Sequence, residues 1–138
     1  MRHPLHPALV HFPVACWSLT TAADLASLVW GEPAWRFAAI VLLVGIGASI
    51  PAMLAGFFEL AKVAPDSPAI KDVNWHMLAV LSALSCYTVS LFMRLDGTRL
   101  IEPGNLAIGF SVLGFVCLGV AGWLGGKLVY GHGLGRSP

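Results

Sequence analysis

The chain has 138 residues, of which 57% are hydrophobic and only 11% charged, and its formal net charge is +1. Soluble globular chains carry about a quarter charged residues, so this chain has too few charges to cover its surface with a solvated layer. The composition therefore indicates an integral membrane protein, and the small net charge argues against electrostatic binding to nucleic acid.

Four apolar stretches are each long enough to cross a bilayer, which takes about 20 residues per helix. Glycine and proline near their ends, such as Gly31 and Pro33 after the first stretch, indicate where the helices stop. We therefore expect an all-α fold, an integral membrane four-helix bundle that forms a single domain over residues 1–138, with both termini on the same side. The predicted spans are 7–30, 34–62, 73–94 and 105–130.

Positive charges are unevenly shared between the two predicted membrane faces. The face that holds both termini, called side A here, carries five Lys and Arg residues, and the opposite face, side B, carries three. Cytoplasmic loops are enriched in Lys and Arg, so the bias favours a cytoplasmic side A.

All five histidines are predicted to gather at side A. The sequence positions that place them there are His3, His6 and His11 in the opening HPLHPALVHFP, His76 in the first turn of the third span, and His132 after the fourth. Imidazole is the commonest metal-ligand side chain and also a proton carrier, and ionisable groups inside spans are functional candidates.

The histidine positions predict which rings meet. His11 and His76 are each expected about one turn inside their spans, so we predict that they pair inside the bundle as cofactor or metal ligands. His6 and His132 form a candidate second pair. His3 would lie at headgroup level, and His3 and His132 taken alone suit interfacial anchors equally well.

Two carboxylates also fall within predicted spans. Glu59, near the side A end of the second span, is either an acceptor for a histidine N–H behind the ligands, a proton relay, or the partner of Lys62 at i+3. Asp24 lies deep in the first span, where a charge facing lipid would be costly, so it should face the bundle with Arg36 or Arg94 within reach.

Small residues recur at four-residue spacing in two spans, at Ala48, Ala52 and Gly56 and at Gly122 and Gly126. Such spacing lets helices approach closely, which predicts helix–helix packing, and it would also clear room for a flat macrocycle.

The three cysteines, Cys16, Cys86 and Cys117, lie in apolar segments without a CxxC motif, so we expect small buried hydrophobes. Zinc-site motifs, a Ser/His/Asp arrangement and a phosphate-binding loop are all absent from the sequence.

Three segments resemble a bacterial membrane family, domain of unknown function 2231: HPLHPALVHFPVACW at the start, NWHM around His76, and GGKLVYGHGLG at the end. The resemblance covers essentially the whole chain. It implies a small four-span protein of the bacterial inner membrane and identifies His3, His6, His11, His76 and His132 as the motif histidines. Related modules occur beside redox partners such as Rieske-type domains, which suggests electron transfer.

Three functions fit these observations. The first is a b-type cytochrome-like protein that holds one or two haem b groups between histidines and exchanges electrons with quinone or a redox protein. The second is a copper or zinc site that uses the same histidines without a macrocycle. The third is a structural or assembly subunit without a cofactor. The small-residue faces also favour a homodimer.

Overall fold

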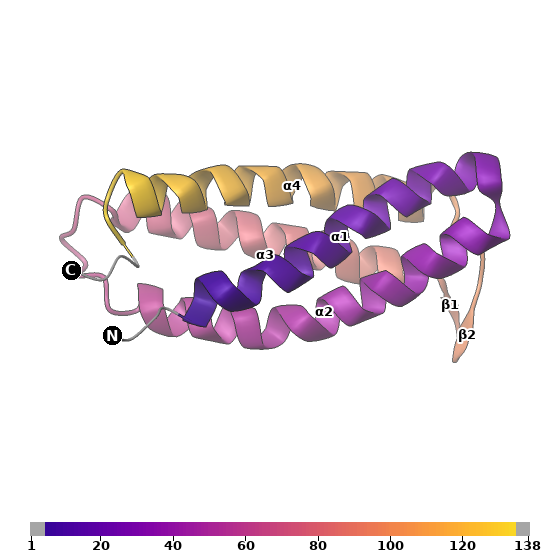
Figure 1. Ribbon diagram of the computed structural model, residues 1–138, viewed down its shortest axis with the longest axis horizontal. Helices are drawn as coiled ribbons and strands as arrows, with labels where there is room; N and C mark the ends of the chain where they lie inside the picture. The colour runs from indigo at the N-terminus through magenta and orange to yellow at the C-terminus, as the bar shows by residue number, and fades with distance from the viewer. Residues whose placement is uncertain (1–4, 135–138) are drawn as a thin grey trace.

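Four long helices make up most of the computed structural model, which describes residues 5–134. They are α1 (Leu5–Trp30), α2 (Glu32–Leu60), α3 (Ile70–Phe92) and α4 (Asn105–Tyr130), as Figure 1 shows. A short antiparallel hairpin joins α3 to α4. Its strands β1 (Leu95–Asp96) and β2 (Arg99–Leu100) pair with Leu95 opposite Leu100. The all-α prediction is confirmed, and the helix bounds differ from the predicted span bounds by at most three residues.

The helices form two antiparallel pairs. α1 packs mainly against α2 and α3 mainly against α4, whereas α2 and α3 touch each other least of these neighbours. α1 begins and α4 ends at the same end of the bundle (Figure 1), which is the end we continue to call side A. α2 and α3 pack loosely, so space remains between them.

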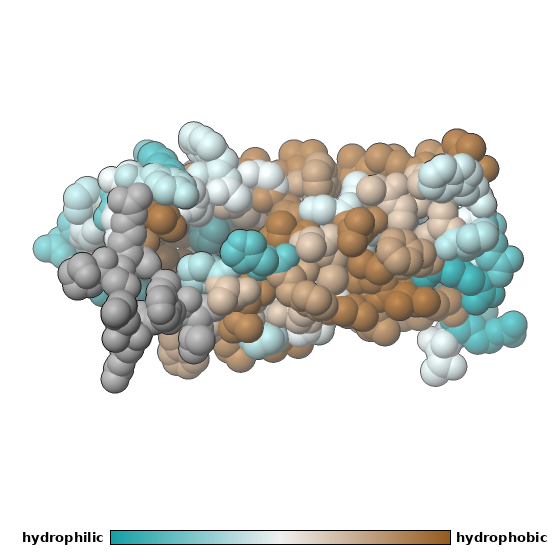
Figure 2. All heavy atoms as spheres, viewed as in Figure 1, coloured by the Kyte–Doolittle hydropathy of each residue, from teal (hydrophilic) through white to brown (hydrophobic). Residues whose placement is uncertain are grey.

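Apolar side chains cover the outside of the bundle. Each helix is long and apolar enough to cross a membrane, and in the most apolar 18-residue window of each no more than 33% is buried inside the protein. Figure 2 shows the result as a hydrophobic band between two hydrophilic ends. A surface of this kind would be unstable in water, so lipid is the solvent that the fold requires.

Glycine and proline shape the first helix pair. Gly31 alone separates α1 from α2, and its φ of 66° lies in the left-handed region that glycine adopts without strain. Pro33 follows in the first turn of α2, where its missing N–H costs no helical hydrogen bond. Pro13 and Pro51 lie inside α1 and α2, as membrane helices tolerate.

An aromatic pair occupies the centre of the bundle. The rings of Trp17 and Tyr87 stack with centroids 5.0 Å apart and, together with Leu42 and Ala83, form the main buried apolar cluster. Gly45 lets α2 approach this pair, because a Cβ there would lie 2.8 Å from Cδ1 of Trp17. The stack therefore joins α1, α2 and α3 at mid-height.

Buried hydroxyls surround the same aromatic pair. The phenol of Tyr87 donates to the backbone oxygen of Trp17 at 3.0 Å, and its oxygen lies 2.9 Å from Oγ1 of Thr21. Thr21 in turn lies 2.9 Å from Oγ of Ser111 on α4 and donates to the Ser111 carbonyl at 3.0 Å. This network satisfies polar groups that would be costly to leave unpaired in a bilayer.

Asp24 and Arg94 form a buried ion pair toward side B. Nη1 and Nη2 of Arg94 each donate to one carboxylate oxygen of Asp24 at 2.6 Å, and both side chains are 0% exposed. Ser90 accepts a further hydrogen bond from Arg94 at 2.8 Å. The prediction that Asp24 faces the bundle within reach of Arg94 is confirmed. Arg36 instead pairs with Glu32 at the surface.

Candidate functional site

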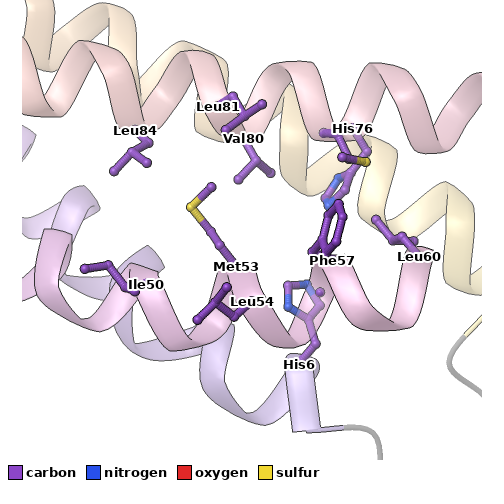
Figure 3. Close-up of a pocket in the computed structure, with 12 residues that line it drawn as sticks. His6, Ile50, Met53, Leu54, Phe57, Leu60, His76, Val80, Leu81 and Leu84 are labelled. Atoms are coloured by element: carbon purple, nitrogen blue, oxygen red, sulfur yellow. The ribbon is translucent and has the colours of Figure 1, made fainter.

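A cavity of about 460 Å³ lies between α2 and α3 in the side A half of the bundle (Figure 3). Its lining is almost entirely apolar, with His6 from α1 and His76 from α3 as its imidazoles and Met53 and Met77 as its thioethers. This volume falls within the range of about 300–1,000 Å³ that is typical of small-molecule and cofactor sites. An apolar cavity with two polar groups is the strongest candidate site in the described part of the chain.

The ring of His6 is held against α2. Its Nδ1 lies 2.7 Å from the carbonyl oxygen of Ala52, and because a carbonyl only accepts, Nδ1 carries the hydrogen. Gly56, one turn along α2, leaves the space for the ring, since a Cβ there would lie 2.7 Å from Cε1 and Nδ1 of His6. In the neutral ring Nε2 is therefore the nitrogen with a free lone pair.

The ring of His76 is held in the same way against α4. Its Nδ1 lies 2.9 Å from the carbonyl oxygen of Ala121, so this nitrogen is also the donor. Gly125 is the glycine that faces the ring, because a Cβ there would lie 3.3 Å from Cε1 of His76. Both cavity histidines thus donate through Nδ1 to a helix carbonyl and keep Nε2 for a ligand.

This hydrogen-bond pattern is typical of ligating histidines. A metal-bound imidazole almost always donates its other N–H to a carbonyl or carboxylate, which fixes its tautomer and orientation. Figure 3 shows the rings of His6 and His76 projecting into the cavity from opposite sides, with the ring of Phe57 between them in this view. The cavity is therefore lined by two imidazoles, each held in a fixed orientation by its own backbone carbonyl.

The number of ligands restricts the kind of metal group that fits. Within residues 5–134, no group of three or more His, Cys, Asp or Glu side chains is placed to hold a metal ion. Structural zinc sites use four such ligands, whereas a b-type haem needs only two axial imidazoles because the macrocycle supplies the other four nitrogens. The donor set at the cavity therefore fits haem better than zinc.

His11 lies apart from this site. Its side chain is exposed on the outer surface of α1, and it does not line the cavity. We predicted that His11 lies inside the bundle beside His76, and this placement of His11 was wrong. Five residues along a helix turn the chain by about 140° beyond one full revolution, so His6 and His11 cannot face the same cavity. The structure brings His6, not His11, to the cavity with His76.

His132 has a different partner. Its Nε2 lies 2.8 Å from Oδ2 of Asp72, whose Oδ1 accepts from Nζ of Lys127 at 2.9 Å. These contacts fold the segment after α4 back onto the start of α3, where Leu134 packs against a small apolar cluster. His132 does not line the cavity, so it does not form the predicted second pair with His6. His3 lies outside the described residues.

Glu59 supports His6 through the backbone. Its Oε1 accepts a hydrogen bond of 3.4 Å from the backbone N–H of His6, in the first turn of α1, where no helical carbonyl is available. Acceptance from a histidine ring was one of the three roles considered for Glu59, but the carbonyls of Ala52 and Ala121 accept from the rings of His6 and His76. Lys62, the alternative partner, forms no ion pair with Glu59 in the described part of the chain.

Several site features were not predicted from the sequence. The carbonyls of Ala52 and Ala121 and the thioethers of Met53 and Met77 carry no sequence signal of their own. The small-residue spacing did mark Gly56, which receives His6 and so has a role in the site. Of the α4 glycines, Gly122 and Gly126 face open space, and Gly125 is the one that contacts a histidine.

Comparisons with known proteins assign the chain to a family but give no function. Neither the curated proteins nor the solved structures include a match. A family model described as "Predicted membrane protein (DUF2231)" matches residues 2–138. Together with the four membrane-spanning helices, this match identifies the chain as a multi-pass membrane protein that belongs to the DUF2231 family.

Proposed function

We propose that the protein binds a b-type haem in the cavity between α2 and α3, with Nε2 of His6 and Nε2 of His76 as the axial ligands. The bound iron would supply one-electron redox chemistry, and the protein would exchange electrons with quinone or with a redox protein in the bacterial inner membrane. One haem per chain is proposed, because His11 and His132 do not reach this cavity.

The single observation that carries the proposal is the shared geometry of the two imidazoles. Each donates through Nδ1 to a backbone carbonyl, at 2.7 Å from Ala52 and 2.9 Å from Ala121, and each lines the same apolar cavity. Each axial ligand needs one ring nitrogen that carries no hydrogen and is not engaged elsewhere, and here Nε2 is that nitrogen on both neutral rings.

The remaining residues around the cavity suit a large apolar group. Phe57, Leu60 and Val80 are among the apolar side chains that would surround a macrocycle held by His6 and His76. Exclusion of water and hydrogen bonding to the axial imidazoles are two of the ways in which a protein sets the potential of a haem.

The test is an absorption spectrum with matched variants. The protein is expressed with added haem and purified in mild detergent, and a reduced-minus-oxidised spectrum is recorded. We expect Soret and α bands in the wild type and in His11→Ala, which removes an exposed imidazole from the same helix, and their loss in His6→Ala and His76→Ala. Absence of haem bands from the wild type refutes the proposal. If His11→Ala loses the bands while His6→Ala or His76→Ala keeps them, the proposed ligand pair is refuted.

A copper site is the second candidate, because two methionine sulfurs line the cavity together with the two imidazoles. Thioether and imidazole ligands suit Cu(I), which does not need carboxylates. Metal analysis after purification separates the candidates. A copper content of about one per chain without a Soret band supports the copper site if that content falls in Met53→Leu and Met77→Leu. Bound iron that disappears in His6→Ala and His76→Ala but stays in the two methionine variants supports haem.

A further inference from the structure

The chain turns back across the side A end of the bundle after α4 ends at Tyr130 (Figure 1). Gly133 has a φ of 70°, in the left-handed region that glycine adopts without strain. Beyond this turn, the backbone N–H of Leu134 donates to the carbonyl oxygen of Leu128 at 3.0 Å. We call residues 131–134 the strap, and none of them lines the cavity itself.

A carboxylate on α3 holds the strap in place. Nε2 of His132 lies 2.8 Å from Oδ2 of Asp72, and the other carboxylate oxygen accepts from Nζ of Lys127 at 2.9 Å. Since Lys127 lies in the last turn of α4, Asp72 joins the start of α3 both to the end of α4 and to the strap. The side chains of Asp72 and His132 are only 14% and 22% exposed, so their contact is screened less than a surface pair would be.

The apolar side chain of the strap lies at the end of the cavity. Leu134 packs against a small cluster formed by Ala69, Val73 and Leu128. Leu60 and Met77 pack against the same cluster, and both also line the cavity. Leu60 is the last residue of α2, and Met77 follows His76 near the start of α3, so the two shared residues mark the side A end of the cavity.

We propose that the strap closes the side A end of the cavity against water, and that the contact between His132 and Asp72 keeps it closed. Opening requires the loss of this contact and the exposure of Leu134 to water. A closed strap keeps the imidazole of His76 in an apolar environment, and exclusion of water is one way in which a protein sets the potential of a haem. This regulatory role rests on the proposed haem site, whereas the closure itself is testable in the protein without haem.

The test measures the access of a charged reagent to the covered end of the cavity. Met77→Cys places a thiol at a residue that the cluster and the cavity share. The haem-free variant in detergent is treated with a positively charged, water-soluble methanethiosulfonate. Peptide mass spectrometry follows labelling at position 77 and separates it from labelling of the three native cysteines.

We expect slow labelling while the strap is closed and faster labelling once it is released. Adding His132→Ala should raise the rate about tenfold or more, because labelling follows the open fraction and the loss of a charge-assisted hydrogen bond changes an equilibrium by about this factor. Leu134→Ala should also raise the rate, since it removes the apolar contact. Hydrogen exchange at 131–134, measured in the same variants, reports whether the strap itself has opened.

Two matched variants separate the strap from other effects. His132→Gln keeps an N–H donor with a similar reach, so labelling at position 77 should stay slow. Arg36→Ala removes the surface ion pair with Glu32 at side B and should leave the rate unchanged. Circular dichroism shows whether each variant keeps its helices. Leu60→Cys, at the other shared residue, repeats the measurement and controls for the loss of the Met77 side chain.

The proposal is overturned if thiols at both shared positions label rapidly while the strap is intact. It is also overturned if labelling stays slow in His132→Ala although hydrogen exchange at 131–134 rises, because the strap would then not cover the cavity. If exchange at 131–134 does not rise in His132→Ala, the contact with Asp72 does not keep the strap closed. No measurement here uses haem, so absence of haem bands refutes the proposed function and leaves the closure to be decided by the labelling.

Discussion

Replacing Arg94 with alanine should destabilise the bundle far more than any surface charge change. The substitution removes both 2.6 Å hydrogen bonds to Asp24 and leaves that carboxylate in a site where the side chain is 0% exposed. Removing one partner of a buried ion pair costs about 3–5 kcal/mol, because the remaining charge stays buried without compensation. We expect a loss of this size in the free energy of unfolding.

The surface pair of Glu32 and Arg36 is the matched control. It joins residues four apart on α2 at 2.6 Å, but its side chains are 56% and 62% exposed. Such pairs contribute about 0.3–0.5 kcal/mol. Unfolding of wild type, Arg36→Ala and Arg94→Ala in mixed dodecyl maltoside and SDS micelles, followed by circular dichroism, compares the two pairs under one condition.

A double variant separates the charge effect from lost packing. Replacing Asp24 with leucine and Arg94 with methionine removes both charges and keeps apolar volume, so it should recover most of the stability that Arg94→Ala loses. If Arg94→Ala lies within about 1 kcal/mol of wild type, or matches Arg36→Ala, the buried charge is compensated in some other way. The electrostatic reasoning would then be wrong.

Three further changes test other parts of the structure. Gly56→Ala places a Cβ 2.7 Å from the His6 ring and should abolish the proposed haem bands while the helical circular dichroism persists. Tyr87→Phe removes the phenol from the central network and should lower the free energy of unfolding by about 0.5–1.5 kcal/mol, measured in mixed micelles. Asp72→Asn weakens the contacts of this side chain with Lys127, in the last turn of α4, and with His132, in the segment after it, and should speed hydrogen exchange at 131–134, measured by mass spectrometry.

The sequence predicts the helices well because hydropathy and helix-stop residues are local signals. Apolar runs that stop before Gly31 and Pro33, or that begin after Gly104, place helix ends to within a few residues. The cost of a charge in lipid likewise predicts that Asp24 turns inward, and Arg94 is its partner in the structure. Both inferences follow from the apolar character of the bilayer and from the number of residues needed to cross it. Neither requires knowledge of how side chains pack.

The partners at the site could not be predicted in the same way, because they depend on where α1 begins and on its rotation. α1 begins at Leu5, so His6 already lies in its first turn, and about 100° of rotation per residue turns His11 to the outer surface.

The cavity beside α2 is bordered by side chains that also face the membrane, among them Leu54, Phe57 and Leu81, all about half-exposed or more. A ligand can therefore reach it by lateral diffusion through the acyl chains, and no aqueous gate is needed. Its occupancy then depends on the mole fraction of ligand in the lipid or micelle rather than on its concentration in water. For an apolar ligand that is not coordinated by the histidines, adding detergent at constant protein and ligand would lower the occupancy by dilution within the apolar phase.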